Sequence, residues 1–195
     1  MAKELKIEIK PLKIGRIKVK VIGKTPYLPE PMDMAVLERY DNKKANKTYS
    51  KDDVSESEKV KEKYYFTENK KKGIPARAFY QSMIRASSYF FEKSEGGMRN
   101  IKEGITIKGD ILPLKYKKES VVTHWGRTSG ASKSPRKIMR NQFIDWSTEF
   151  EIEFNQAWLS AEQIINILNW AGFHIGVGGF RKEKSGNYGS FFVKL

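Results

Sequence analysis

The chain has 195 residues, of which 37 are Lys or Arg and 23 are Asp or Glu, giving a formal net charge of +14. It contains no apolar run long enough for a membrane span and no secretory signal at its amino terminus, so we expect no membrane association. Because cysteine is absent, a disulfide framework, a cysteine-based zinc site and a thiol nucleophile are excluded, and a cytoplasmic setting is favoured.

The amino-terminal half of the sequence predicts a strand, an insertion and a helix. Residues 12–23 alternate as a half-buried strand does, with Ile17, Val19 and Val21 against Arg16, Lys18 and Lys20. Three prolines and a long polar stretch then predict an insertion over residues 24–72. A helix is predicted over 75–92, with polar side chains on its other side, namely Arg77, Gln81 and Arg85.

The middle of the sequence predicts two more strands, separated by a second insertion. Residues 104–112 and 148–155 alternate between apolar and polar side chains. Residues 113–140 are rich in Ser, Gly, Pro and basic side chains without sustained periodicity. They are predicted as a long loop or a flexible hairpin.

The carboxy-terminal part predicts a helix, a glycine-rich loop and a last strand. Ser160 and Gln163 form a capping-box pattern at the start of a helix over 160–171, which Gly172 is expected to end. The last strand is predicted over 188–195. The length favours one domain over residues 1–195.

The order strand, helix, strand, strand, helix, strand predicts an α+β fold with a ferredoxin-like (RRM-like) βαββαβ core, an antiparallel sheet and two long insertions. The first and third strands are then neighbours at the centre of the sheet. The basic row of the first strand would face Glu149, Glu151 and Glu153 on the helix-free side and be neutralised there. That side also lacks the stacking aromatics of RNA-binding RRM domains, so loops and helix ends are the better candidates for binding.

Half of the net charge lies in the second insertion. Residues 113–140 have eight Lys or Arg and one Glu, a net charge of +7, whereas residues 141–172 have no Lys or Arg. Cations interleaved with an indole suit a nucleic-acid strand, because they neutralise phosphates while the ring stacks on a base. The candidate binding residues are Trp125, Arg127, Lys133, Arg136, Lys137 and Arg140. The alternative is a solvated basic loop anchored by Trp125.

The carboxy-terminal loop combines five glycines with cations. Gly176, Gly178, Gly179, Gly186 and Gly189 would let the backbone approach a phosphate or another chain, and Arg181, Lys182, Lys184 and Tyr188 are further candidate contacts. The loop lacks the Lys-Ser/Thr ending of a nucleotide-binding P-loop.

This ending, Gly-x-Gly, a basic stretch and Gly-x-x-Gly-x-Phe at Gly186, Gly189 and Phe191, resembles the glycine-rich loop of the RAMP superfamily of CRISPR proteins. The wider sequence, with Gly73-Ile74-Pro75-Ala76, also looks like a group of phage and prophage proteins. The resemblance implies an RRM-like core, binding of single-stranded nucleic acid through loops and assembly along the strand.

Catalysis is the weaker interpretation. Some nucleases of that superfamily use a histidine as general base, and His124 lies in the basic stretch beside Arg127. A lone histidine next to a tryptophan is more often a binding or packing residue, and His174, at a helix exit, is expected to be structural. The carboxylates do not predict a convergent metal site.

The leading hypothesis is therefore a non-enzymatic protein that binds single-stranded DNA or RNA with weak sequence preference and without a cofactor. It would act in the cytoplasm, of a host cell if a phage encodes it, and copies would assemble along the strand. One alternative is a metal-independent RAMP-type endoribonuclease. Another is a viral assembly or interaction protein that binds an acidic protein partner.

Overall fold

The central sheet of the computed structural model has four antiparallel strands in the order β4-β8-β1-β9. They are Ile14–Gly23 (β1), Ile105–Ile107 (β4), Ser147–Asn155 (β8) and Phe191–Lys194 (β9). The first and third core strands, β1 and β8, are neighbours at the centre, as the ferredoxin-like topology requires. The structure describes residues 11–31, 63–92, 96–127 and 135–194, and the predicted ferredoxin-like fold is confirmed within them.

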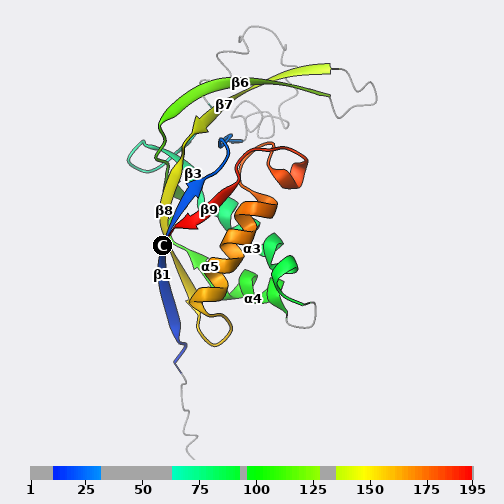
Figure 1. Cartoon of the computed structure of the whole chain (residues 1–195). Coiled ribbons are helices and arrows are strands. Elements are labelled where there is room, and N and C mark those ends of the chain that lie inside the picture. The colour runs from blue at the N-terminus through cyan, green and yellow to red at the C-terminus, as the bar shows by residue number, and fades with distance from the viewer. Residues whose placement is uncertain (1–10, 32–62, 93–95, 128–134, 195) are drawn as a thin grey trace, which may run out of the picture.

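Three helices cover one face of this sheet: Ala76–Phe90 (α3), Gly97–Gly104 (α4) and Ala161–Trp170 (α5) (Figure 1). Side chains from the helices and the strands form one buried cluster, which includes Phe79, Ile152, Ile164 and Phe191. The predicted capping box is present, since Ser160 Oγ accepts a hydrogen bond from Gln163 N at 3.1 Å and Gln163 Oε1 accepts one from Ser160 N at 2.9 Å. Among the described residues, no helix is long and apolar enough to cross a membrane.

The helix expected to end at Gly172 continues for another turn. A π-helical turn, Ala171–Ile175, follows α5 directly, and Gly176 N donates to Ala171 O at 2.8 Å. A Cβ at Gly172 would lie 2.2 Å from Phe191 O, so this glycine allows the turn to pack closely on β9. The helical segment ends instead at Gly176, where φ is 79°.

The strand predicted over 104–112 is two strands in different sheets. After β4 ends, Gly109 adopts a φ of 86° and redirects the chain. Ile111–Pro113 (β5) then pairs with Lys72–Pro75 (β3), and β3 pairs with Tyr65–Phe66 (β2). The carboxy-terminal end of the first insertion thus belongs to this second sheet. The polar stretch expected within the insertion lies outside the described residues.

The last strand is also shorter than the predicted 188–195. Gly189 has a φ of 67°, and Lys24 N and Thr25 N both donate to Ser190 O. Regular pairing with β1 therefore begins only at Phe191, opposite Gly23.

Residues 113–140, predicted as a long loop or a flexible hairpin, contain most of an antiparallel ribbon. Lys118–Arg127 (β6) pairs with Pro135–Ile144 (β7) along their whole length. We call this ribbon the arm. It extends beyond the central sheet at the end opposite α4 (Figure 1).

The base of the arm is held by one carboxylate. Glu119 accepts hydrogen bonds from Lys72 Nζ at 2.8 and 2.6 Å, from Tyr116 Oη at 3.1 Å and from Tyr64 Oη. Lys72 Nζ also lies 4.0 Å from the centre of the Tyr64 ring. The arm is thereby attached to β3 and to the chain just before β2.

The helix-free face of the central sheet carries the predicted charge ladder. Arg16 faces Glu153, Lys18 faces Glu151 and Lys20 faces Glu149 in the β1–β8 register. Arg16 Nε lies 2.8 Å from Glu153 Oε1, and Lys20 Nζ lies 3.3 Å from Glu149 Oε1. Hydrogen bonds from Lys115 and Lys20 lower the pKa of Glu149. The basic row of β1 is thus paired with the glutamates of β8, as the sequence predicted, while Lys108 and Lys115 share the same carboxylates and Lys194 lies opposite Lys20.

Candidate nucleic-acid interface

The pleat of the arm separates residues that are adjacent in the basic stretch. Trp125 pairs with Lys137 across the arm, and both side chains are exposed, that of Trp125 to 74%. His124 pairs with Ile138, and both are half-buried. Because successive side chains of a strand point to opposite faces, Trp125 and Lys137 share the outer face of the arm.

The other face of the arm contacts the glycine-rich loop. The His124 ring lies 4.6 Å from the ring of Phe180 and 5.3 Å, edge-on, from that of Tyr188. Its Nε2 atom is buried without a hydrogen-bond partner, and burial together with the charge of Arg140 lowers the pKa of His124. In this geometry His124 is a neutral packing residue whose Nε2 does not face solvent, which does not favour a role as general base.

Arg140 also belongs to this contact. Its guanidinium carbon lies 4.9 Å above the Phe180 ring, and Nη2 forms an ion pair with Glu30 at 2.9 Å. Lys184 Nζ lies 3.8 Å from the other oxygen of the same carboxylate. Arg140 and Lys184, two of the predicted binding residues, are thus partly neutralised and hold the arm against the loop.

The remaining predicted arm residues lie toward the tip. Arg127 pairs with Pro135 and Arg136 pairs with Gly126 at the last rungs of the ribbon. Lys133 lies outside the described residues. The structure thus brings the two predicted binding segments, the arm and the glycine-rich loop, side by side.

The glycines of the loop serve its own packing. A Cβ at Gly178 would lie 2.4 Å from Leu28 O, and one at Gly189 would lie 1.8 Å from Val177 O, while both residues have positive φ. The other predicted glycines are also in close contact with neighbouring chain: Gly176, Gly179 and Gly186. The sequence interpretation assigned these residues to the close approach of a phosphate or of another chain, and in the structure they lie close to other segments of this chain.

A hollow of about 280 Å³ lies between this loop and the start of α3. Arg77, Arg85 and Arg181 line it together with Gln81, Gly176 and Gly178. We call it the arginine pocket. Arg181 forms an ion pair with Glu183 at 2.8 Å and donates to Gly178 O at 3.0 Å, and Arg85 also pairs with Glu183. One carboxylate therefore serves two guanidinium groups.

Arg77 adds a third positive charge to the pocket. Its side chain is exposed and makes no ion pair with a carboxylate in the described part of the chain. The first turn of α3 has no acidic residue, and Pro75 provides no side-chain cap. The positive end of the helix dipole adds to the guanidinium charge at this point.

Sequence reasoning placed Arg77 and Arg85 on the polar side of the helix but not in a site. The spacing Arg77-Gln81-Arg85 puts the three side chains on one stripe of α3. The one signal in the sequence that could have indicated a site is this stripe, which begins just after Pro75 at the start of the helix. The missing information was that the glycine-rich loop, about 100 residues later in the chain, packs beside it.

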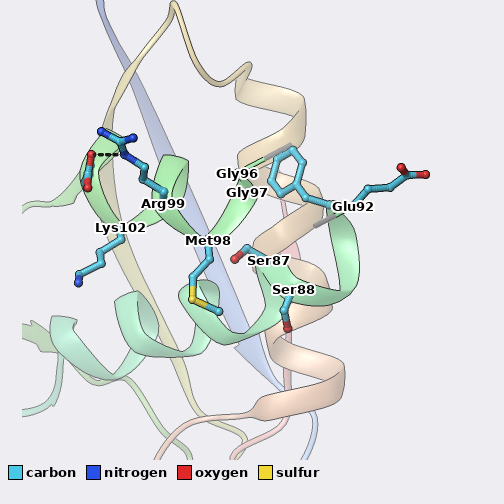
Figure 2. Close-up of a pocket in the computed structure, with 10 residues that line it drawn as sticks. Ser87, Ser88, Glu92, Gly96, Gly97, Met98, Arg99 and Lys102 are labelled. Carbon is cyan, nitrogen blue, oxygen red and sulfur yellow. Dashed lines mark hydrogen bonds and ion pairs between the residues drawn. The ribbon is translucent and has the colours of Figure 1, made fainter. Parts of the chain in front are cut away.

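A second hollow, of about 520 Å³, lies at the far end of α3 and is lined in part by Ser87, Phe91, Met98 and Lys102 (Figure 2). Its charged residues balance, because Arg99 pairs with Glu103 at 3.0 Å and the lining also contains Lys102 and Glu92. The arginine pocket is lined by three guanidinium groups, two of which share the carboxylate of Glu183, and is the better site for a polyanion.

No protein-family model matches the chain, and no curated protein matches it. Solved structures similar to it include two that cover more than nine tenths of this chain. Cmr6 from Pyrococcus furiosus has 11% identity and a TM-score of 0.43, over 94% of this chain and 100% of Cmr6. Cas6 from Thermus thermophilus has 12% identity and a TM-score of 0.32, over 91% of this chain and 53% of Cas6. No family, function or residue role is taken from either protein.

Proposed function

We propose that this protein binds single-stranded nucleic acid without a catalytic step and holds phosphates of the strand in the arginine pocket. The observation that carries the proposal is the convergence of Arg77, Arg85 and Arg181 on one hollow. Glu183 forms ion pairs with two of them, Arg85 and Arg181. Guanidinium groups donate planar pairs of hydrogen bonds to phosphate oxygens. The unpaired backbone N–H groups at a helix start favour an anion at the same place.

The arm supplies a second contact in this proposal. Trp125 offers an exposed ring for stacking, and Lys137, on the same face, offers a charge for a phosphate. Arg127, Lys133 and Arg136 remain further proposed contacts from the sequence of the arm. His124, Arg140 and Tyr188 instead keep the arm against the glycine-rich loop, so that arm and pocket have a fixed relation.

The expected binding mode follows from these contacts. Phosphate contacts dominate, so sequence preference is weak and affinity decreases as salt concentration increases. No group in the pocket selects for a 2′-hydroxyl, and the proposal covers both DNA and RNA. Assembly of copies along the strand, in the cytoplasm of a phage's host, is part of the proposal.

The test is a titration of the protein into fluorescently labelled single strands of about 20 nucleotides, read by anisotropy at two salt concentrations. We expect micromolar or tighter binding at low salt to both DNA and RNA, and clear weakening at the higher concentration. Absence of binding at low salt would contradict the proposal. A stoichiometry that stays at one copy on longer strands would contradict assembly along the strand.

A further inference from the structure

An aromatic surface continues from the arginine pocket along the helical layer. It consists of Tyr89 near the end of α3, Trp170 at the end of α5, and Phe173 and His174 in the π-helical turn. Tyr89, Phe173 and Trp170 are exposed to 61%, 55% and 40%. We call these four residues the aromatic platform.

The other three rings of the platform lie around that of His174. Its ring is stacked with that of Tyr89, with centres 5.6 Å apart and planes 25° apart. The centres of the Trp170 and Phe173 rings lie 5.0 and 4.9 Å from it. Side chains from two separate helical segments thus form one contiguous surface, although each ring keeps a large part of its area in contact with solvent.

The π-helical turn is what completes this surface. The turn extends the helical segment from Trp170 to Gly176, and Gly172 allows it to pack closely on β9. Phe173 and His174 are thereby presented outward while Ile175 is buried. Short π-helical turns are found frequently at functional sites. A core helix that ended at Gly172 would lack two of the four rings.

Positive charge borders the platform. Lys182 Nζ lies 3.9 Å from the centre of the Phe173 ring. Arg85, which lines the arginine pocket, precedes Tyr89 by four residues and therefore lies one turn away on the same side of α3. The cations of α3, Arg77 and Arg85, thus lead to the ring of Tyr89, and Lys182 borders the ring of Phe173.

We propose that the aromatic platform stacks bases of the same strand whose phosphates occupy the arginine pocket. This inference rests on the proposed function. It adds a site for the bases of the bound strand. The face of a base stacks on Tyr89 or Phe173, and the neighbouring phosphates of the strand reach Lys182 and Arg85 at the border. The charge at the border favours this occupant over an apolar protein surface, since such a surface would bury Lys182 without a counter-charge.

The test compares an intact oligonucleotide with one of equal length whose sugars carry no bases, on the wild-type protein and on Tyr89→Ala/Phe173→Ala. Both replaced side chains are more than half exposed, so we expect the variant to fold. For the wild type, we expect removal of the bases to weaken binding about tenfold or more. For the variant, we expect the affinity for the intact strand to fall to nearly that of the base-free strand. Trp158→Ala, at an exposed aromatic after β8, is the matched control and is expected to keep wild-type affinity.

The possible outcomes separate this inference from the proposed function. If the wild type binds neither strand, the proposed function fails. If it binds the intact strand and the variant loses no affinity, binding of nucleic acid stands and the platform assignment is overturned. If the variant keeps its affinity but light scattering shows that it has lost self-association, the platform is an interface between copies of this chain.

Discussion

His124 and Trp125 are adjacent on β6, but His124 packs against Phe180 of the glycine-rich loop whereas Trp125 points to the opposite face of the arm and is 74% exposed. A sequence motif that reads as one binding element is therefore two surfaces. One attaches the arm to the body of the protein, and the other is available for a ligand.

Replacement of Trp125 by Ala is expected to weaken binding of a single strand about tenfold, because one stacked base loses its ring. The thermal midpoint is expected to change little, since the indole is mostly exposed. Anisotropy titration and a thermal melt measure the two quantities. Val121→Ala, on the same face and 50% exposed, is the control, and an equal loss of affinity in both variants would refute a specific role of the indole.

Replacement of His124 by Phe is expected to preserve the contacts with Phe180 and Tyr188 and to remove the buried Nε2 atom that lacks a partner. The pKa of His124 is lowered from 6.5 in the folded state, so the unfolded chain takes up a proton first as the pH falls. Wild-type stability should therefore decrease as the pH falls below about 6.5, towards the lower folded pKa, and the variant should show less of this decrease.

Urea unfolding of both proteins at several pH values checks this. Above pH 7, we expect the free energy of unfolding to depend on pH in the same way for both proteins. The variant also tests the nuclease alternative. Metal-independent cleavage of RNA by the wild type that disappears in His124→Phe would contradict the packing role.

Replacement of Gly189 by Ala is expected to destabilise the protein strongly, by about 3 kcal/mol, because the new methyl group meets Val177 O in a backbone of positive φ. Gly109→Ala is the matched control. Gly109 also has positive φ, but the nearest atom to a Cβ there is 4.0 Å away, so only the backbone cost of about 1–2 kcal/mol is expected. Denaturant unfolding measures both, and equal losses would show that the loop does not need the close contact.

Replacement of Glu119 by Gln is expected to loosen the base of the arm. Burial alone would raise the pKa of Glu119, but hydrogen bonds from Lys72 and Tyr64 outweigh it and the pKa is lowered from 4.5. Its contribution to stability is therefore complete above pH 4.5 and is lost as the pH falls through the lower folded pKa. We expect Glu119→Gln to cost about 1–2 kcal/mol at pH 7 and to flatten the acid side of the stability profile. Hydrogen exchange in β6 that is unchanged in the variant would contradict the anchoring role.

The core of the fold could be predicted because its strands each have one buried and one solvated face. Arg16 and Glu153 lie in rows of strict alternation, and alternation determines both the strand and the face that it buries. The arm also has two unlike faces, but its inner face packs on the glycine-rich loop through polar and aromatic side chains such as His124 and Arg140, so its sequence does not alternate between apolar and polar residues. The sequence therefore left both a loop and a hairpin open. In the sheet, alternation also predicted which charges meet, whereas in the arm local patterns indicated only where charge is located.

The contacts that define the candidate site join residues far apart in the chain. Arg85 and Glu183 are 98 residues apart, and Arg140 and Glu30 are 110 apart. No spacing rule connects such pairs. For this reason Arg140, an expected binding residue, is an ion-pair partner within the protein, whereas Arg77, which the sequence placed only on a polar helix face, lines the pocket.

The central claim is that the arginine pocket, and not the charged sheet, holds phosphate. The most direct measurement is the dependence of strand affinity on salt concentration for Arg77→Gln and, as a matched control, Arg16→Gln, which removes a guanidinium that is paired with Glu153. We predict that Arg77→Gln weakens binding and lowers the slope of log affinity against log salt by about 0.7, the value for one phosphate contact on a single strand. We predict wild-type affinity and slope for Arg16→Gln. Equal effects of the two replacements, or a larger effect of Arg16→Gln, would contradict the account.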